Sequence, residues 1–328
     1  MKSKTLIKQT LGHFFTDAAC ALVIFSATHD IKQAFIYFIA YNFLAFCLQP
    51  VAGFVLDKFQ KIKPSHYITT AFILLIIGFV PFLPAWEKVI FIGIGNCLFH
   101  TGAGTIILNS SKKKMAPLGI FVSSGALGLT LGTLLSPYAQ VHNVCMMALL
   151  ILEIFNLTAT EEKITKKSGS IHWKIAPLLC LCIVIRSFMG FISVTTFVKS
   201  APIILMITCG VVAGKALGGL LCDKWGIRRV ATFSTLIVVA LFLFSFHNPY
   251  LWTMVQLIVN LSMPITLYLI YESMPHLPAF SFGLAASFLC VGYWAALPFR
   301  GLSVHPACLL ILFIANLGII LYSERKLR

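Results

Sequence analysis

The sequence is short of charged residues, and above all of acidic ones. Its 328 residues include only 10 Asp and Glu against 25 Lys and Arg, and charged residues make up 11% of the chain. Because about a quarter of the residues of a soluble globular domain are charged, this composition excludes that class. The mean hydropathy of +0.93 also excludes an intrinsically disordered chain.

Several motifs of soluble enzymes are missing as well. The sequence has no G-x-x-x-x-G-K-[ST] nucleotide-binding loop, no H-E-x-x-H zinc motif and no C-x-x-C pair among its 10 cysteines. We therefore expect no nucleotide-driven pump, no cofactor and no metal site. The cysteines are expected to be buried thiols.

Apolar runs are what the sequence has in abundance. A run of about 20 apolar residues crosses a hydrocarbon core of about 30 Å as a helix, and such runs recur along the whole chain. The sequence therefore predicts an all-α membrane protein with twelve transmembrane helices. We place these spans at 9–28, 32–56, 67–85, 89–110, 117–137, 141–158, 174–195, 201–222, 229–247, 250–271, 280–299 and 304–322.

The Lys and Arg residues are unevenly distributed between the two sides of this membrane protein. With the N-terminus in the cytoplasm, 19 of the 25 lie in cytoplasmic segments, four lie in external loops and two lie inside spans. Short cytoplasmic loops carry an excess of Lys and Arg. This bias predicts a multi-pass protein of the cytoplasmic membrane with both termini in the cytoplasm. It accounts for the net charge of +15 without a nucleic-acid partner, and membrane lipid is the expected contact of the basic loops.

The chain divides into two halves of six spans. The polar segment 159–173 follows the sixth span and has the composition of a cytoplasmic linker, so we predict one six-helix bundle over 1–158 and another over 174–328. The stretches 53-GFVLDKFQKIK-63 and 219-GLLCDKWGIRR-229 each follow the second span of their half. Halves related by an internal repeat are a recurrent plan of transporters, with the substrate site between them.

In each of these stretches an Asp-Lys pair begins four residues after a glycine. The glycine permits close helix packing, and the carboxylate is expected to cap the next helix or to pair with the basic cluster, as a gating lock that breaks easily. An ordinary basic loop with a stray Asp is the alternative. The pattern resembles the signature G-x-x-x-D-[RK]-x-G-[RK][RK] of the major facilitator superfamily. The second copy fits nearly throughout, at Gly219, Asp223, Lys224, Gly226, Arg228 and Arg229. In the first copy Gly53, Asp57 and Lys58 fit, but Gln60 replaces the second glycine and lysines replace the arginines.

Through the layout of two times six spans the resemblance covers the whole chain. It implies two pseudo-symmetric six-helix bundles and secondary transport by alternating access. A narrower resemblance, to the fosmidomycin-resistance-like branch, implies efflux. It is carried by 12-GHFFTD-17, 48-LQPVAGFVLDK-58, 94-IGNCLFHTGAG-104 and 271-YESMPHLPAFSFG-283. The fifth span keeps the glycines of drug antiporters in 125-GALGLTLG-132 but lacks their embedded Gly-Pro, which argues against drugs as the solute.

Polar side chains lie near the middle of spans one, four, seven and ten. Ionisable groups inside a membrane are costly and mark functional sites, and in the superfamily these four spans line the central cavity. The predicted substrate-binding and proton-binding residues are His13 and Asp17, Asn96 and His100, Arg186, and Gln256 and Asn260.

The chemistry of these residues indicates the kind of solute. Asp17, His100 and His13 are able to carry a proton, whereas Arg186 stays charged and presents a planar fork to a carboxylate or phosphate. Such a cavity suits a small anionic or zwitterionic solute. Alternatively, Asp17 and Arg186 form a structural ion pair, His13 is a packing residue and the amides bridge helices.

The sequence therefore predicts a monomeric secondary transporter that moves a small anionic or zwitterionic solute by proton-coupled efflux. Uptake of a metabolite, proton-coupled or facilitative, is an alternative. A membrane-embedded His/Asp enzyme is another, but it needs a third metal ligand near His13 and Asp17. A transporter-like sensor that binds its ligand without moving it is the last.

Overall fold

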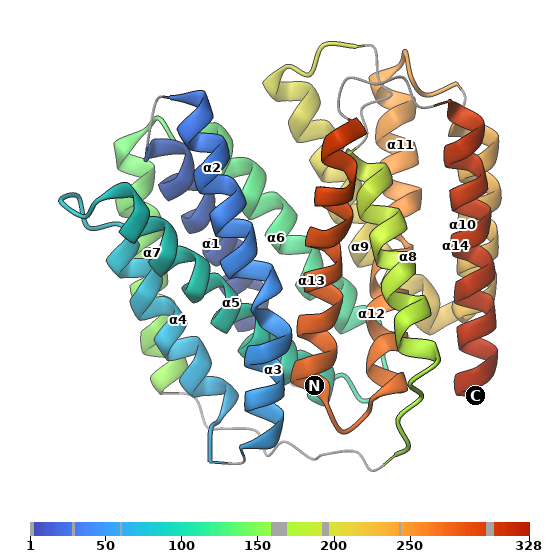
Figure 1. Cartoon of the computed structure of the whole chain (residues 1–328), viewed down its shortest axis with the longest axis horizontal. Helices are drawn as coiled ribbons and strands as arrows, with labels where there is room; N and C mark the ends of the chain where they lie inside the picture. Colours follow the sequence, from blue (N-terminus) through green and yellow to red (C-terminus); the bar gives the residue numbers. More distant parts are fainter. Residues whose placement is uncertain are drawn as a thin grey trace. The chain divides into compact units, whose positions relative to one another are not determined.

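The computed structural model describes residues 3–27, 30–59, 61–158, 169–191, 197–242, 244–299 and 305–328, and within them all regular structure is helical. Residues 159–168 of the predicted linker lie outside this set. The helices of the first half are α1 (Ser3–Ser26), α2 (Ile31–Asn42), the π-helix η1 (Phe43–Cys47), α3 (Gln49–Lys58), α4 (Pro64–Gly78), α5 (Ala85–Ser110), α6 (Ala116–Leu135) and α7 (Ala139–Leu157). Those of the second half are α8 (Ile175–Phe191), α9 (Ala201–Trp225), α10 (Ile227–Phe242), α11 (Pro249–Asn260), α12 (Ser262–Ser273), α13 (Pro278–Ala296), the 3-10 turn η2 (Leu297–Phe299) and α14 (Pro306–Leu327) (Figure 1).

Within the described residues these elements make up twelve helical segments, in the predicted order. Eight segments are long and apolar enough to cross a membrane, and α4 and most of α8 are shorter apolar helices. Many large apolar side chains are exposed on the helices, among them Phe54, Ile154 and Ile311, as expected where lipid replaces water. The prediction of an all-α membrane protein with twelve spans is confirmed.

Two of the spans are interrupted. The second is built from α2 and α3 with η1 between them, and in Figure 1 these elements follow one another in one rod. The tenth breaks at Leu261, between α11 and α12. Pro264 explains this second break, because proline has no N–H to donate to the carbonyl one turn earlier. The apolar pattern of the sequence gives no sign of either interruption.

By their contacts the helices form two compact units. Unit 1 comprises Met1–Lys112, Ser124–Lys167 and His276–Ser287, and unit 2 comprises the segments Lys113–Ser123, Ser168–Pro275 and Phe288–Arg328. The units follow the halves of the sequence except at two helices: the start of α6 groups with unit 2, and the start of α13 groups with unit 1. The domain boundaries at 158 and 174 stay a prediction.

Helix α5 lies at the centre of unit 1. It contacts α1, α2, η1, α3 and α4, and 72% of its most apolar stretch is buried. Its glycines make the contact with α4 close: a side chain at Gly95 would meet Ala71, and one at Gly102 would meet the carbonyl of Pro64. The side chains of α5 therefore face protein on nearly every side.

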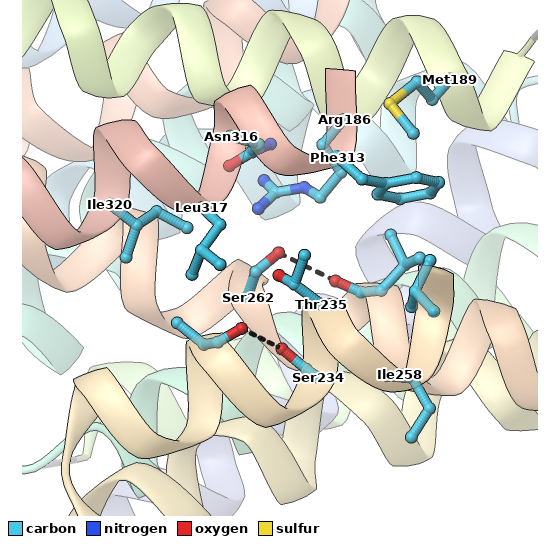
Figure 2. A pocket seen from close by; sticks show the side chains of 13 residues that line it. Arg186, Met189, Ser234, Thr235, Ile258, Ser262, Phe313, Asn316, Leu317 and Ile320 are labelled. Atoms are coloured by element: carbon cyan, nitrogen blue, oxygen red, sulfur yellow. Dashed lines mark hydrogen bonds between the residues drawn. The ribbon is translucent and has the colours of Figure 1, made fainter. Parts of the chain in front are cut away.

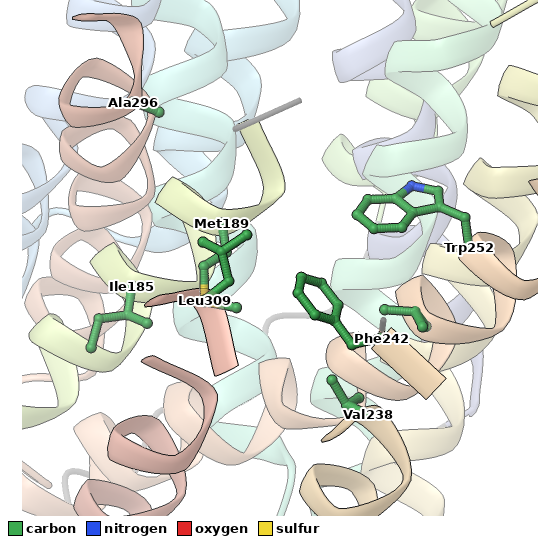
Figure 3. Packing of buried hydrophobic residues seen from close by; sticks show 8 residues of the cluster. Ile185, Met189, Val238, Phe242, Trp252, Ala296 and Leu309 are labelled. Atoms are coloured by element: carbon green, nitrogen blue, oxygen red, sulfur yellow. The ribbon is translucent and has the colours of Figure 1, made fainter. Parts of the chain in front are cut away.

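Unit 2 has a compact apolar core (Figure 3). Its members come mainly from α8, α10, α11 and α14, and include Ile185, Val238, Phe242, Trp252 and Leu309. The rings of Phe242 and Trp252 lie 6.3 Å apart between centroids. Helix α8 packs against α14 and α12, and its part in this core positions the arginine of α8 described below.

Candidate functional site

Four of the predicted site residues come together in unit 1. His13 and Asp17, one turn apart on α1, face His100 of α5. The Nε2 atoms of the two imidazoles are 2.8 Å apart, and the carboxylate oxygens of Asp17 lie 3.3 Å from His13 Nε2 and 3.7 Å from His100 Nε2. Asn96, one turn before His100, donates from Nδ2 to Asp17 Oδ1 at 2.9 Å. All four side chains are buried or nearly so, with Asp17 the most exposed at 15%.

The backbone of α5 sets the orientation of His100. Its Nδ1 lies 3.0 Å from the carbonyl oxygen of Asn96, and a carbonyl only accepts hydrogen bonds. Nδ1 therefore carries a proton, and in the neutral form of His100 the lone pair of Nε2 faces His13. In that form His13 Nε2–H donates the 2.8 Å hydrogen bond.

The surroundings of this cluster are largely apolar. The ring centroids of Phe99, Phe46 and Phe282 lie 5.8, 6.3 and 6.5 Å from that of His100. Among the described residues Asp17 forms ion pairs only with the two imidazoles, and no Lys or Arg pairs with it. The carbonyl oxygen of the Asn96 side chain is buried without a hydrogen-bond partner.

The glycines of α6 explain how a third helix approaches the cluster. A Cβ atom at Gly125 would collide with His13 Nε2 and Asp17 Oδ2, and Cβ atoms at Gly128 and Gly132 would collide with backbone carbonyls of α1. The glycine-rich stretch found in the sequence is thus the surface on which α6 packs against α1.

His13, Asp17 and His100 are also the one group of His, Cys, Asp and Glu in the described chain placed to hold a metal ion. Each offers one ligand atom, and these atoms lie within 4.8 Å of one another. A metal site at His13 and Asp17 needs a third ligand, which the sequence alone did not place beside them. In the structure His100 lies in that position.

Arg186 belongs to unit 2 and lies on α8, with 8% of its surface exposed. Its Nη1 donates to the hydroxyl of Thr266 at 3.0 Å and its Nη2 to the sulfur of Met263 at 2.9 Å. Both partners are neutral. Within the described part of unit 2, no carboxylate pairs with this guanidinium.

A small cavity of about 30 Å³ lies beside Arg186. Figure 2 shows its guanidinium directed into the space between Asn316, Leu317 and Ser262. The hydroxyl of Ser234 donates to the carbonyl oxygen of Ala231 within α10, and that of Ser262, at the start of α12, donates to the carbonyl oxygen of Val259 in α11. Each hydroxyl therefore keeps lone pairs for an incoming donor. The remaining lining is mostly aliphatic or aromatic.

The two predicted amides of the tenth span lie on α11, away from this lining. Asn260 donates from Nδ2 to the carbonyl oxygen of Gln256 at 2.8 Å, within the same helix. Its Cβ lies 3.0 Å from where a Cβ at Gly214 would be, so Asn260 packs against α9. The role of Gln256 and Asn260 in binding a solute stays a prediction.

The Asp residues of the repeated motif cap helices that belong to the other half of the sequence. In unit 1, Asp57 accepts the backbone N–H of Ala279 at 3.2 Å and of Phe280 at 2.8 Å, at the start of α13. In unit 2, Asp223 accepts the N–H of Met115 at 2.7 Å and of Ala116 at 3.0 Å, at the start of α6.

The glycines of the motif allow this capping. A Cβ atom at Gly53 would collide with the backbone of Ala279, and one at Gly219 with the backbone of Met115. The expectation that the carboxylates cap the next helix is therefore wrong. Each reaches a helix far away in sequence, because the adjacent glycine brings that helix into contact.

The basic residues of the motif have other neighbours. Lys58 lies 5.7 Å from the ring centroid of Phe54, Lys224 lies 6.0 Å from that of Trp225, and Arg229 is exposed.

The ion pair in this region uses a residue that the sequence did not single out. Arg228 Nε lies 2.7 Å from Glu324 Oε2, and Arg328 also pairs with Glu324. The expectation that Asp223 pairs with the basic cluster is thus not met: its carboxylate accepts two backbone N–H groups. Glu324 stands beside Arg325 and Lys326 in the sequence, and no local pattern there predicts that it is buried.

Comparison with known proteins agrees with this fold. No family model and no curated protein matches the chain. Among solved structures, the E. coli fucose:proton symporter FucP matches with a TM-score of 0.73 and 14% identity over 97% of both chains. A second FucP structure, in the outward conformation, gives 0.71 and 15% over 97% of both chains. The chain has the fold of the major facilitator superfamily transporters.

A bacterial homologue of the iron transporter ferroportin, in the outward-facing state, is also similar. Its TM-score is 0.62, with 9% identity over 98% of both chains. At these identities the likeness describes the fold alone. The narrower resemblance to the fosmidomycin-resistance-like branch stays a prediction.

Proposed function

We propose that this chain is a secondary active transporter of the cytoplasmic membrane that moves a small anionic or zwitterionic solute by alternating access, coupled to protons. The fold supports the carrier class, because the similar solved structures are those of transporters. We propose export as the direction, which the sequence resemblance favours. Because FucP is a fucose:proton symporter, proton-coupled uptake is the alternative.

The buried Arg186 is the observation on which the proposed class of solute, an anion or zwitterion, rests. A guanidinium does not lose its proton in a protein, and placing a charge at the middle of a membrane helix costs at least about 2.5 kcal/mol. The neutral contacts to Thr266 and Met263 offset only part of this cost. An anionic solute that docks on the remaining N–H groups would supply the missing countercharge.

The size of the cavity defines how much of the solute it receives. A volume of about 30 Å³ holds about two water-sized groups, which is enough for one carboxylate but not for a whole metabolite. The lone pairs of Ser234 and Ser262 suit an ammonium or hydroxyl group of the same solute. The apolar remainder of the wall favours a solute with a single acidic group.

The cluster of unit 1 supports proton coupling. The 2.8 Å contact between His13 and His100 requires one proton between the two rings, and Asp17 lies within reach of both. These are the groups from which a carrier would release and recover a proton during its cycle.

Flux in proteoliposomes tests the proposal. Small organic acids, amino acids and phosphonates, fosmidomycin included, are first ranked by the thermal shift they give the purified protein. The best ligand is then assayed for saturable counterflow, with and without a pH gradient. Protein-dependent flux that the gradient accelerates supports a coupled carrier. Saturable binding without movement would identify a sensor, and chemical conversion of the ligand would identify an enzyme.

A further inference from the structure

We propose that His13, Asp17 and His100 form a binding site for one divalent first-row transition-metal ion, such as Zn²⁺ or Fe²⁺. Such a site goes beyond the transport proposed above, because it depends on neither the solute nor the direction of flux. It rests on the geometry, the second layer of contacts and the charge of the cluster.

The distances between the three ligand atoms are close to those found in a metal site. In a tetrahedral zinc site with bonds of about 2.0–2.1 Å, the ligand atoms lie about 3.3–3.4 Å apart. Here the two nitrogen-to-oxygen distances, from Asp17 to His13 and to His100, are 3.3 and 3.7 Å. The two nitrogens are 2.8 Å apart. The rings therefore need to separate by only about half an ångström to admit the ion.

The surrounding contacts are those of a metal site. Histidines that bind metals usually donate their other ring N–H to a carbonyl or carboxylate, and His100 Nδ1 does so to the carbonyl of Asn96. This bond directs the Nε2 lone pair into the cluster. The side-chain amide of Asn96 holds Asp17 in place, and its buried oxygen lacks a hydrogen-bond partner. That oxygen, or a water, is the expected fourth ligand.

The charge and the donor set define the class of ion. Asp17 is a buried carboxylate whose ion-pair partners among the described residues are two imidazoles, so a dication compensates its charge. Two nitrogens and one oxygen favour Zn²⁺, Fe²⁺, Co²⁺ or Ni²⁺, whereas Mg²⁺ and Ca²⁺ prefer oxygen ligands alone. Two His and one carboxylate with open positions are also the ligand set of non-haem Fe²⁺ sites.

Loading the site moves one proton away from Nε2 of His13. The ion forms bonds to His13 Nε2, His100 Nε2 and Asp17, and the neutral His13 ring then carries its proton on Nδ1, because a neutral imidazole has one N–H and one lone pair. Neither step changes an oxidation state. Bound metal and the proton of the His13–His100 hydrogen bond therefore exclude each other at His13 Nε2.

The binding experiment uses the purified full chain, titrated with ZnCl₂ in a calorimeter and, separately, with MgCl₂. We expect one Zn²⁺ per chain and no matching Mg²⁺ site. Asp17→Asn and His100→Gln should each weaken Zn²⁺ binding at least tenfold. The control His66→Gln removes an exposed imidazole at the start of α4 and should leave the affinity unchanged. A loss confined to His66→Gln, or wild-type affinity in both folded cluster variants, overturns the site.

A second measurement needs no variant of the cluster. X-ray absorption of the zinc-loaded wild type should report two imidazole nitrogens and one or two oxygens at about 2.0–2.1 Å. A spectrum with oxygen ligands alone, or no retained zinc after gel filtration, would overturn the site even if the variants fail to fold. Because both readouts concern binding, a failure here leaves the flux test of the carrier unaffected.

Discussion

His13 and His100 share a hydrogen bond of 2.8 Å between their Nε2 atoms, although 87 residues separate them in the sequence. The bond links α1 to α5 and lies next to the carboxylate of Asp17. Because a contact this short between two ring nitrogens requires one proton between them, the two rings form one ionisable unit. A change at either ring therefore alters the hydrogen bonding of the carboxylate as well.

Gly125→Ala should disrupt this cluster without removing any of its side chains. The added methyl group would meet His13 Nε2 and Asp17 Oδ2, so α6 has to move away from α1 at a cost of about 1–3 kcal/mol. We expect a lower melting temperature and reduced flux.

Gly318→Ala in α14 is the matched control for this prediction. Nothing lies within 4 Å of its added Cβ, and Ala favours a helix over Gly by up to about 1 kcal/mol. Its stability should equal or exceed that of the wild type. Equal melting temperatures for Gly125→Ala and the wild type would mean that α6 does not pack on the cluster.

Asp57→Asn and Asp223→Asn should each lower stability, because each carboxylate caps a helix with both oxygens. An amide offers one acceptor where the carboxylate offers two, and losing a cap costs about 0.5–2 kcal/mol. Thermal unfolding in detergent measures the loss.

Variants of the neighbouring lysines distinguish helix capping by the Asp residues from an ionic lock. Lys58 and Lys224 contact aromatic rings of their own segments, so Lys58→Gln and Lys224→Gln should have little effect on stability. If the lysine variants lose as much stability as the Asp variants, the Asp residues act through ion pairs rather than as caps.

Arg186→Ala should abolish binding of anionic solutes, and Arg186→Lys should retain part of it. Lysine keeps the charge but lacks the planar fork that binds a carboxylate with two parallel hydrogen bonds. The thermal shift given by the best acidic ligand is the readout. Thr266→Ala, which removes a neutral partner of the guanidinium, is the milder comparison. An unchanged shift in Arg186→Ala would assign the arginine a structural role.

Much of the fold follows from the sequence alone. Runs of apolar residues predict twelve spans, and helical periodicity places His13 with Asp17, and Asn96 with His100, one turn apart. Those pairs depend only on the 3.6-residue repeat of one helix. Only the structure shows which helices face each other, for instance α1 and α5. No local sequence pattern contains this information.

The Asp residues of the motif show where sequence reasoning ends. Asp57 caps a helix whose first N–H groups lie 222 and 223 residues further along the chain. The choice of that helix depends on the close approach at Gly53, where a Cβ would collide with Ala279. The buried Glu324 escaped notice for the same reason, since its partner Arg228 lies on a distant helix.

Proton movement driven by the solute tests the central claim most directly. Proteoliposomes loaded with a pH-sensitive dye receive a gradient of the best ligand, for the wild type and for Asp17→Asn. We predict that the wild type moves protons as the solute moves, and that Asp17→Asn inserts and binds the ligand but moves no protons. Solute flux without any pH change in the wild type, or wild-type proton flux in Asp17→Asn, would contradict the account.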